Sequence, residues 1–271
     1  MALVGRWQLH PLHLYLARSY LDLDDLTLPL EGPSYGRTTQ QLGEVARREA
    51  STMEALGILV RNEIEPRLAR ALKVLAKPYL WVDSLWFPDF ASDHAWRAVV
   101  AMTEGQRVVL GVQGPGETER FGGVLTVEVH ERTTLSEVLI PTLPPARPGN
   151  RAPVRVPESS LRQNPREELD SLLEQVSHSR GSSGDQQVAA YHEIGQAVHV
   201  RGGQLAANLR DRYGRVRRSQ VVRWFDNAEP DGRYLDHSER GSTGEQMYVI
   251  TPADGGVIRA TIDQLVAAVR G

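Results

Sequence analysis

Apolar and polar positions in the C-terminal third of the chain predict an antiparallel sheet. After Gly203, four segments are enriched in apolar and aromatic residues and are separated by turn compositions rich in Gly, Asn and Asp. These connections are too short for a parallel return, which needs about a dozen residues, so consecutive strands must be antiparallel neighbours. The predicted strands are residues 204–212, 215–225, 232–237 and 246–251.

A helix is predicted to close the chain after this sheet. Its apolar residues are Ile258, Ile262, Leu265, Val266 and Val269. This spacing places them on one face of a helix, and that face must pack against the sheet or against other helices.

The N-terminal part of the chain carries strong helix signals. Thr38 and Gln41 have the spacing of a capping box, and Gly57 is a suitable residue to end the helix that they begin. Proline stands at the first position of the helices before and after it, where no N–H is needed. The predicted helices are residues 11–21, 38–56 and 66–77, with Pro78 stopping the third.

A short strand is predicted before the first helix, at residues 7–9, and several extended segments follow the third helix. The pair Glu104-Gly105 predicts a tight two-residue hairpin. Residues 124–130 alternate between apolar and polar side chains, which suits a strand with one buried face and one wet face. The predicted elements are strands at 79–87, 97–103, 106–112 and 124–130, and a helix at 133–143.

A proline-rich stretch at residues 141–157 divides the chain. It contains six prolines, which lack the N–H that strand pairing needs, so we predict an extended linker without a ladder of its own. The segments before and after this stretch have the same predicted order of helices, then strands, then a helix. In the second half the predicted helices are 167–176 and 185–198, and a polar loop at 177–184 joins them. We therefore predict one domain over 1–271 with repeated halves 1–144 and 153–271; two unrelated α+β layers are the alternative.

Composition narrows the functional classes. The hydrophobic and charged fractions of 41% and 24% are those of an ordinary globular protein. No apolar run is long enough to span a membrane, and the N-terminus lacks the features of a signal peptide. Cysteine is absent, which removes disulfides, thiolate catalysis and zinc–cysteine sites. A cytoplasmic protein is expected.

No catalytic arrangement emerges from the motifs. His192 and Glu193 begin like a zinc-hydrolase helix, but Gln196 occupies the position that the second metal-binding histidine needs. His199 lies two turns from His192, too far for the two to share a metal without another element. A metal-dependent hydrolase remains an alternative function, and we predict no catalytic residue, metal site or cofactor.

Seven arginines between residues 201 and 223 form what we call the arginine strip. Such a strip could bind nucleic acid, because arginine pairs well with phosphate. The net charge of −3 and the missing RNA-stacking aromatic pattern favour solvent or a partner's carboxylates instead. The strip consists of Arg201, Arg210, Arg212, Arg215, Arg217, Arg218 and Arg223.

Several short segments, taken in order, resemble one protein family. PSYGRT at 33–38, ahead of a long helix, is similar to the N-terminal signature of the EspG family, the type VII (ESX) secretion-associated proteins of actinobacteria. No single motif is chemically diagnostic, so the resemblance rests on order and spacing across nearly the whole chain. The other matching segments are LGIL at 56–59, PRLARAL at 66–72, LAKP at 75–78, GRY at 232–234 and YVITP at 248–252.

The resemblance implies both a fold and a function. The fold would be α+β: a central, mostly antiparallel sheet flanked by helical bundles, with two quasi-twofold related halves. The function would be that of a cytosolic chaperone that binds PE–PPE-like helical secretion substrates, or other small helical-hairpin proteins, and keeps them soluble for export. No cofactor, nucleic-acid partner or membrane insertion is implied, and no oligomeric state is specified.

By the same resemblance, the partner should dock on the C-terminal half, at residues 204–225 and the helix 185–198. If residues 215–225 form one strand, Arg218, Gln220, Val222 and Trp224 share a face, and we predict that they contact the partner. The alternative places Trp224 in the core. An exposed Arg218 would tolerate Arg218→Glu with little change in melting temperature.

Overall fold

The computed structural model describes residues 2–32, 38–91, 94–103, 105–117, 122–161, 183–242 and 244–271. Its centre is an 11-stranded sheet with the order β1-β7-β6-β5-β4-β9-β11-β12-β13-β8, and β10 pairs with β9 beside this path. Every pairing between these strands is antiparallel. The strands are β1 Ala2–Leu9, β4 Leu80–Phe87, β5 Trp96–Met102, β6 Val108–Pro115, β7 Gly122–Glu131, β8 Val154–Pro157, β9 His199–Arg210, β10 Val216–Arg218, β11 Val222–Asn227, β12 Arg233–Arg240 and β13 Gln246–Pro252.

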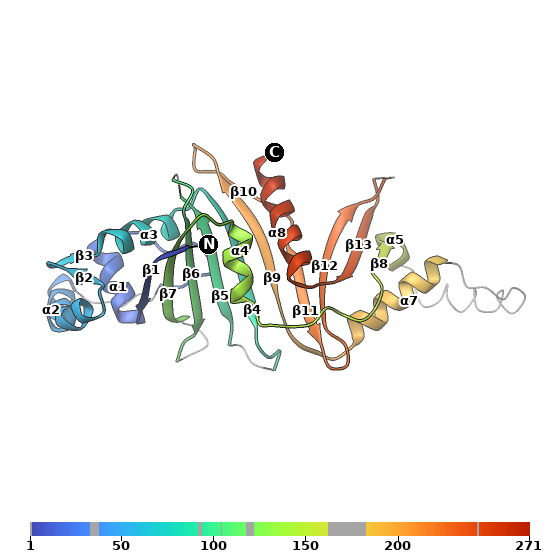
Figure 1. Cartoon of the computed structure of the whole chain (residues 1–271), viewed down its shortest axis with the longest axis horizontal. Helices are drawn as coiled ribbons and strands as arrows, with labels where there is room; N and C mark the ends of the chain where they lie inside the picture. The colour runs from blue at the N-terminus through green and yellow to red at the C-terminus, as the bar shows by residue number, and fades with distance from the viewer. Residues whose placement is uncertain are drawn as a thin grey trace, which may run out of the picture.

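Helices flank this sheet at both ends and near its middle (Figure 1). Helices α1, α2 and α3 gather at one end with the small hairpin β2–β3, α5 and α7 lie at the other end, and α4 and α8 lie side by side near the middle. None of the helices in the described ranges is long and apolar enough to cross a membrane. Their bounds are α1 Pro11–Tyr20, α2 Thr39–Ala55, α3 Pro66–Ala76, α4 Leu135–Leu139, α5 Glu158–Leu161, α7 Ser183–Gln196 and α8 Gly255–Arg270, and the hairpin strands are β2 Leu59–Val60 and β3 Glu63–Ile64.

The strand order has the symmetry that the quasi-twofold prediction requires. Read outward from the centre, β4-β5-β6-β7-β1 in one half matches β9-β11-β12-β13-β8 in the other. In each half the outermost strand comes first in the chain, helices follow it, and a helix closes the half: α4 after β7 and α8 after β13. The antiparallel pair β4–β9 joins the halves. The predicted α+β fold with quasi-twofold halves is confirmed; the exact boundaries of the halves stay a prediction.

One side of the sheet carries a core shared by both halves, which we call the central core. The apolar faces of α4 and α8 cover it, and α8 presents Ile258, Ile262, Leu265 and Val269 as the spacing predicts. Ser136 of α4 donates a 2.8 Å hydrogen bond to Asp263 of α8, which fixes the two helices together. Other members of the central core are Leu80, Val100, Leu139, Leu205, Val222 and Trp224.

The other side of the sheet carries two separate cores, one toward each end. Helices α1, α2 and α3 pack on the N-terminal strands, and α7 packs on the C-terminal ones, including β8. The N-terminal core includes Leu14, Leu68, Leu72, Trp81 and Val127. The C-terminal core is built on Val154, Val156, Ile194, Tyr234 and Ile250.

Local signals in the N-terminal half predict the structure well. Thr38 accepts from the Gln41 N–H at 3.3 Å, and the Gln41 side chain accepts from the Thr38 N–H at 3.2 Å, so the capping box is present. Gly57 ends the helical region in the left-handed conformation at φ +68°. In β7, Leu125, Val127 and Val129 are buried, while Thr126 and Glu128 between them are only partly covered.

Besides shifted ends, such as β1 beginning at Ala2 and β9 at His199, three predicted elements differ from the structure. The strand at 215–225 is two strands, β10 and β11, separated by residues 219–221. The helix at 133–143 contains only α4 and a 3₁₀ turn, because Pro141 cannot continue an α-helix. The connection between β5 and β6 spans residues 103–107 and not two residues, with Gln106 at φ +57°. Glu104 lies outside the described residues, as do residues 33–37, the predicted helix 167–176 and residues 177–182 of the predicted loop.

The prolines at 141–157 do not form a free linker. Val154–Pro157 is the edge strand β8 and pairs with β13, so the prediction of no ladder is wrong for these four residues. An edge position tolerates Pro157 because one side of the strand needs no partner. Ahead of β8, the Gly149 N–H donates to the Arg233 carbonyl at 2.8 Å, and the Arg233 N–H donates to the Arg147 carbonyl at 2.8 Å.

Candidate partner-binding surface

The side of β4 and β9 opposite α4 and α8 forms a partly exposed surface between the N-terminal and C-terminal cores, where Arg218 and Arg223 are exposed and Asp83 and Asn208 are buried. None of the helices in the described ranges packs extensively on this part of the sheet. Side chains from neighbouring strands lie in register across it: Leu85 pairs with Gln204, and Gln204 pairs with Arg223. We call this surface the open face; its residues include Asp83, Leu85, Phe87, Gln204, Asn208, Arg218, Arg223 and Phe225.

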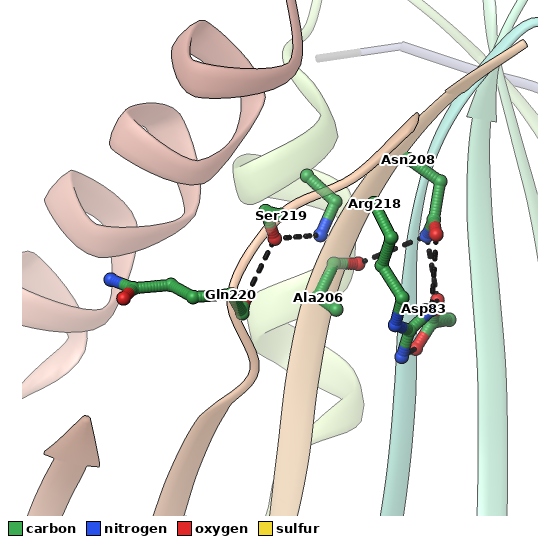
Figure 2. Close-up of polar contacts among 7 residues, drawn as sticks. Asp83, Ala206, Asn208, Arg218, Ser219 and Gln220 are labelled. Carbon is green, nitrogen blue, oxygen red and sulfur yellow. Dashed lines mark hydrogen bonds and ion pairs between the residues drawn. The ribbon is translucent and has the colours of Figure 1, made fainter. Parts of the chain in front are cut away.

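A buried carboxylate anchors one end of the open face (Figure 2). Asp83, 5% exposed, accepts two hydrogen bonds from the Arg218 guanidinium, at 2.6 and 2.9 Å. Asn208 donates to the same carboxylate at 2.7 Å and accepts from Arg218 at 3.0 Å. The paired geometry fixes the guanidinium, and its outer edge still faces solvent because 43% of the Arg218 side chain is exposed.

Structure and prediction disagree about the four residues proposed to form the contact face. Val222 and Trp224 are 0% and 1% exposed and lie in the central core, so neither can touch a partner. Arg218 lies on the opposite side of the sheet, because the break at residues 219–221 changes which face the side chains occupy. Figure 2 shows Gln220 pointing away from the Arg218–Asp83 pair. The interpretation of these four residues as one face is therefore wrong, and only Arg218 belongs to the open face.

Aromatic side chains mark the other end of the open face. Phe90 is 53% exposed and lies beside His199, with 6.4 Å between ring centroids. His199 in turn lies 4.4 Å from the Phe225 ring. A Cβ atom at Gly202 would come within 2.7 Å of the Phe90 ring, so glycine is what lets this aromatic ring approach the strand. The result is an exposed apolar patch next to α7.

A small cavity of about 340 Å³ opens between α7 and the sheet beside this patch. Its lining includes Tyr191, His192, Phe225 and Asp236. Burial raises the pKa of the Asp236 carboxyl, against the opposing effect of Arg223 and His237. Burial also raises the pKa of the Tyr191 hydroxyl. Both shifts have burial as their largest cause, because the charged form of each group loses solvation there.

Part of the arginine strip is used to hold the connector between the halves. Asp226, 3% exposed, accepts from Arg233 at 2.6 and 2.8 Å and from Arg201 at 2.6 Å. Arg233 also donates to the Pro144 carbonyl and Arg201 to the Pro145 carbonyl. One buried carboxylate thus binds two arginines, and both arginines bind the proline-rich connector.

Other members of the strip are also engaged within the molecule. Arg210 donates to the Pro78 carbonyl at 3.2 Å, and its guanidinium lies 5.5 Å from the centroid of the Trp81 ring. Arg217 reaches the Val269 carbonyl at the end of α8 at 3.4 Å. These contacts favour a structural role for the strip over a continuous surface for phosphates.

The histidines of α7 and β9 are placed without a catalytic arrangement. Glu193 forms a 2.6 Å ion pair with Arg151. His199 is hydrogen-bonded to Asn227 at 2.6 Å and to the Gly195 carbonyl at 3.1 Å. Within the described ranges, no three His, Asp or Glu residues are grouped as a metal ion would require.

Comparison with known proteins identifies the family. A model of the EspG family matches residues 10–264, which is most of the chain. The chain belongs to the EspG family. The resemblance seen in the short segments of the sequence is thereby confirmed. No curated protein matches the chain.

A solved structure shares the EspG fold with this chain. It is the Mycobacterium tuberculosis type VII secretion system chaperone EspG5, determined in complex with a PE25–PPE41 dimer. The two chains are 17% identical and superpose with a TM-score of 0.65, over 97% of this chain and 96% of EspG5. At this identity the likeness establishes the fold, including its sheet and flanking helices.

Proposed function

We propose that this EspG-family protein is a cytoplasmic chaperone of a type VII (ESX) secretion system that binds PE–PPE-like helical substrates and keeps them soluble for export. The observation that carries the proposal is the family match over residues 10–264. The fold shared with EspG5, whose structure contains a PE25–PPE41 dimer, supports the same function. The role is binding and not catalysis. Another small helical-hairpin protein would satisfy the same surface.

The open face is the proposed docking surface. Leu85 and Phe87 are partly covered and Phe90 is exposed, so the tip of a helical hairpin would remove apolar surface from water there. Arg218 and Arg223 would form a polar rim that can pair with carboxylates on the partner. The position of Arg218 is fixed in advance by Asp83, which lowers the entropy lost on binding.

Co-expression with a PE–PPE-type pair tests this function. The protein should co-purify with the pair as one complex on size exclusion, and the pair expressed alone should be less soluble. Failure of every PE–PPE-type and helical-hairpin candidate to co-purify would contradict the proposal.

A charge reversal locates the surface. Arg223→Glu on the open face should weaken substrate binding by about tenfold or more, since residues that pair across an interface commonly contribute over 1 kcal/mol. Arg61→Glu is the control, because Arg61 is exposed in the turn between β2 and β3 at the far end of the molecule. Equal binding by wild type and Arg223→Glu would exclude this face.

A further inference from the structure

A second surface, outside the proposed docking face, has the character of a binding site. A cleft of about 790 Å³ lies between α3 and the neighbouring ends of β1, β5, β6 and β7, in the N-terminal half. Its floor is aliphatic and includes Val4, Val74, Val109 and Val129. This volume is within the range of small-ligand and peptide pockets. We call it the α3 cleft.

The rim of the α3 cleft is strongly cationic. Among the described residues, five basic side chains line it against one carboxylate, Glu131. The excess is local, because the whole chain has a net charge of −3. Lys73 and Lys77, the two lysines of the chain, both belong to this rim. The five basic residues are Arg67, Arg70, Lys73, Lys77 and Arg107.

Only part of this positive charge is used by the protein itself. Arg107 forms a 2.6 Å ion pair with Glu131, and Arg67 donates to the Val4 carbonyl at 3.0 Å. Arg70, Lys73 and Lys77 are exposed, and within the described part of the chain none of the three forms an ion pair. Three cations therefore face the solvent around an apolar floor.

The helix itself does not explain this charge. Cations stabilise the C-terminal end of a helix, which accounts for Lys73 in the last turn of α3. Arg67 and Arg70 lie in the first turns after Pro66, at the positive end, where a cation is unfavourable. Together with Lys77 they form a stripe at helical spacing, beside the face that carries the buried Leu68.

We propose that the α3 cleft binds an acidic segment of a partner protein, in which an apolar side chain is flanked by carboxylates. The apolar side chain would lie on the aliphatic floor, and the flanking carboxylates would pair with Arg70, Lys73 and Lys77. A nucleic acid fits less well, because bases need aromatic platforms and Tyr79 is the one aromatic residue in the lining. Tyr79 is 61% exposed at the rim and adds contact area for a peptide.

A fluorescent peptide tests the proposal on the full chain. The probe is a labelled peptide in which glutamates flank one Leu and one Phe, and its control has Gln in place of every Glu. Fluorescence anisotropy should show that the acidic peptide binds and the Gln peptide does not. The affinity of the acidic peptide should fall as the salt concentration is raised. Arg70→Glu with Lys73→Glu should weaken binding at least tenfold. Arg47→Glu with Arg240→Glu changes the net charge equally at exposed sites elsewhere and should leave binding unchanged.

Three results would overturn the proposal. One is equal affinity of the acidic peptide for the α3 cleft variant and the wild type. Another is equal binding of the Gln peptide. The third is that a single-stranded oligonucleotide binds more tightly than the acidic peptide and that Arg70→Glu with Lys73→Glu abolishes its binding. That result would assign the cleft to nucleic acid. The variant should retain its melting temperature and its co-purification with substrate, so the result is separate from the proposed chaperone function.

Discussion

At the scale of single residues, buried acids organise the arginines of this protein. Asp83 and Asp226 are 5% and 3% exposed; Asp83 binds the guanidinium of Arg218 through both carboxylate oxygens, and Asp226 binds those of Arg201 and Arg233. Removing one partner of such a pair leaves a buried charge without compensation. The resulting loss of folding free energy is larger than the stabilisation that the intact pair provides. Arg201 and Arg218 of the strip, and Arg233 beside it, therefore act first as structural residues.

Arg218→Glu should destabilise the protein, contrary to the expectation from the sequence. The substitution removes the partner of Asp83 and places a second carboxylate beside it. The free energy of unfolding should fall by about 1–3 kcal/mol, less than for a fully buried pair because Arg218 is partly exposed. Urea unfolding measures this loss, and Arg215→Glu, at an exposed turn position, is the control. An unchanged midpoint for Arg218→Glu would contradict the pairing.

Trp224→Ala should be among the most damaging single substitutions in the central core. Trp224 is 1% exposed, lies 6.2 Å from the Trp86 ring centroid and carries the Arg233 guanidinium 4.3 Å above its ring. Removing it should cost about 3–5 kcal/mol. The measurement is the midpoint of urea or thermal unfolding; a loss under about 1 kcal/mol would place Trp224 outside the core.

Tyr234 should make stability depend on pH at high pH. Burial, together with the hydrogen bond to Asp231, raises the pKa of Tyr234 to about 12. Above the ordinary tyrosine pKa of about 10, the unfolded chain loses this proton while the folded chain keeps it, so stability falls from about pH 10 to about pH 12. Tyr234→Phe should lower stability by about 1–2 kcal/mol at neutral pH and flatten the decline above pH 10. Parallel slopes for the two proteins would contradict this assignment.

At the scale of elements, the sequence predicts those whose signals are local. The capping box at Thr38, the terminating Gly57 and the spacing of α8 each depend on side chains within a few residues, and each is confirmed. The prediction of one strand at 215–225 is wrong. The alternation of side chains in the sequence continues through residues 219–221, where the structure has a break between β10 and β11. At that break, Ser219 accepts a hydrogen bond from the Ala207 N–H of the neighbouring strand, a contact that no local pattern encodes.

Asp254 should contribute measurably to α8. Its side chain accepts from the Val257 N–H at 2.9 Å and caps a helix that covers the central core. Asp254→Ala should lower the free energy of unfolding by about 1 kcal/mol, and Asp254→Ser should retain most of it. Thermal unfolding of both variants measures the difference; equal loss in both would argue against capping.

The candidate surface was harder to predict than the helices because its residues come from separate strands. Asp83 could have been noticed as a lone acid within the apolar segment LWVDSLWF, since a buried carboxylate requires a partner. Its partner Arg218 is distant in sequence, and the pairing of β4 with β9 is what brings them together. No pattern in the sequence indicates that Leu85 and Phe90 are accessible to a partner. Their accessibility depends on which part of the sheet the helices leave uncovered, and this is a property of the whole fold.

At the scale of the whole molecule, the two halves share one sheet and one core. The central core takes residues from both halves, for example Val100 and Ile262, and β4 and β9 pair along eight positions. Arg201 and Arg233 hold the connector against the second half. We therefore expect that neither half folds as an independent unit.

Residues 1–144 expressed alone should not give a folded monomer. Without the second half, β4 would be an unpaired edge and the central core would lose its cover from α8. Size exclusion with light scattering should show dimers or aggregates. A monomer with dispersed amide resonances would contradict the shared core.

The mirrored strand order has a consequence for how such a chain could arise. An isolated half would end in an exposed β4-like edge, and an antiparallel edge can pair with its own copy across a twofold axis. In this protein the antiparallel pairing of β4 with β9 joins the two halves edge to edge in the same way, within one chain. The present sheet therefore has the geometry of a fused homodimer. Fusion allows the two copies to diverge, so that one half could carry the α3 cleft without requiring the same surface in the other.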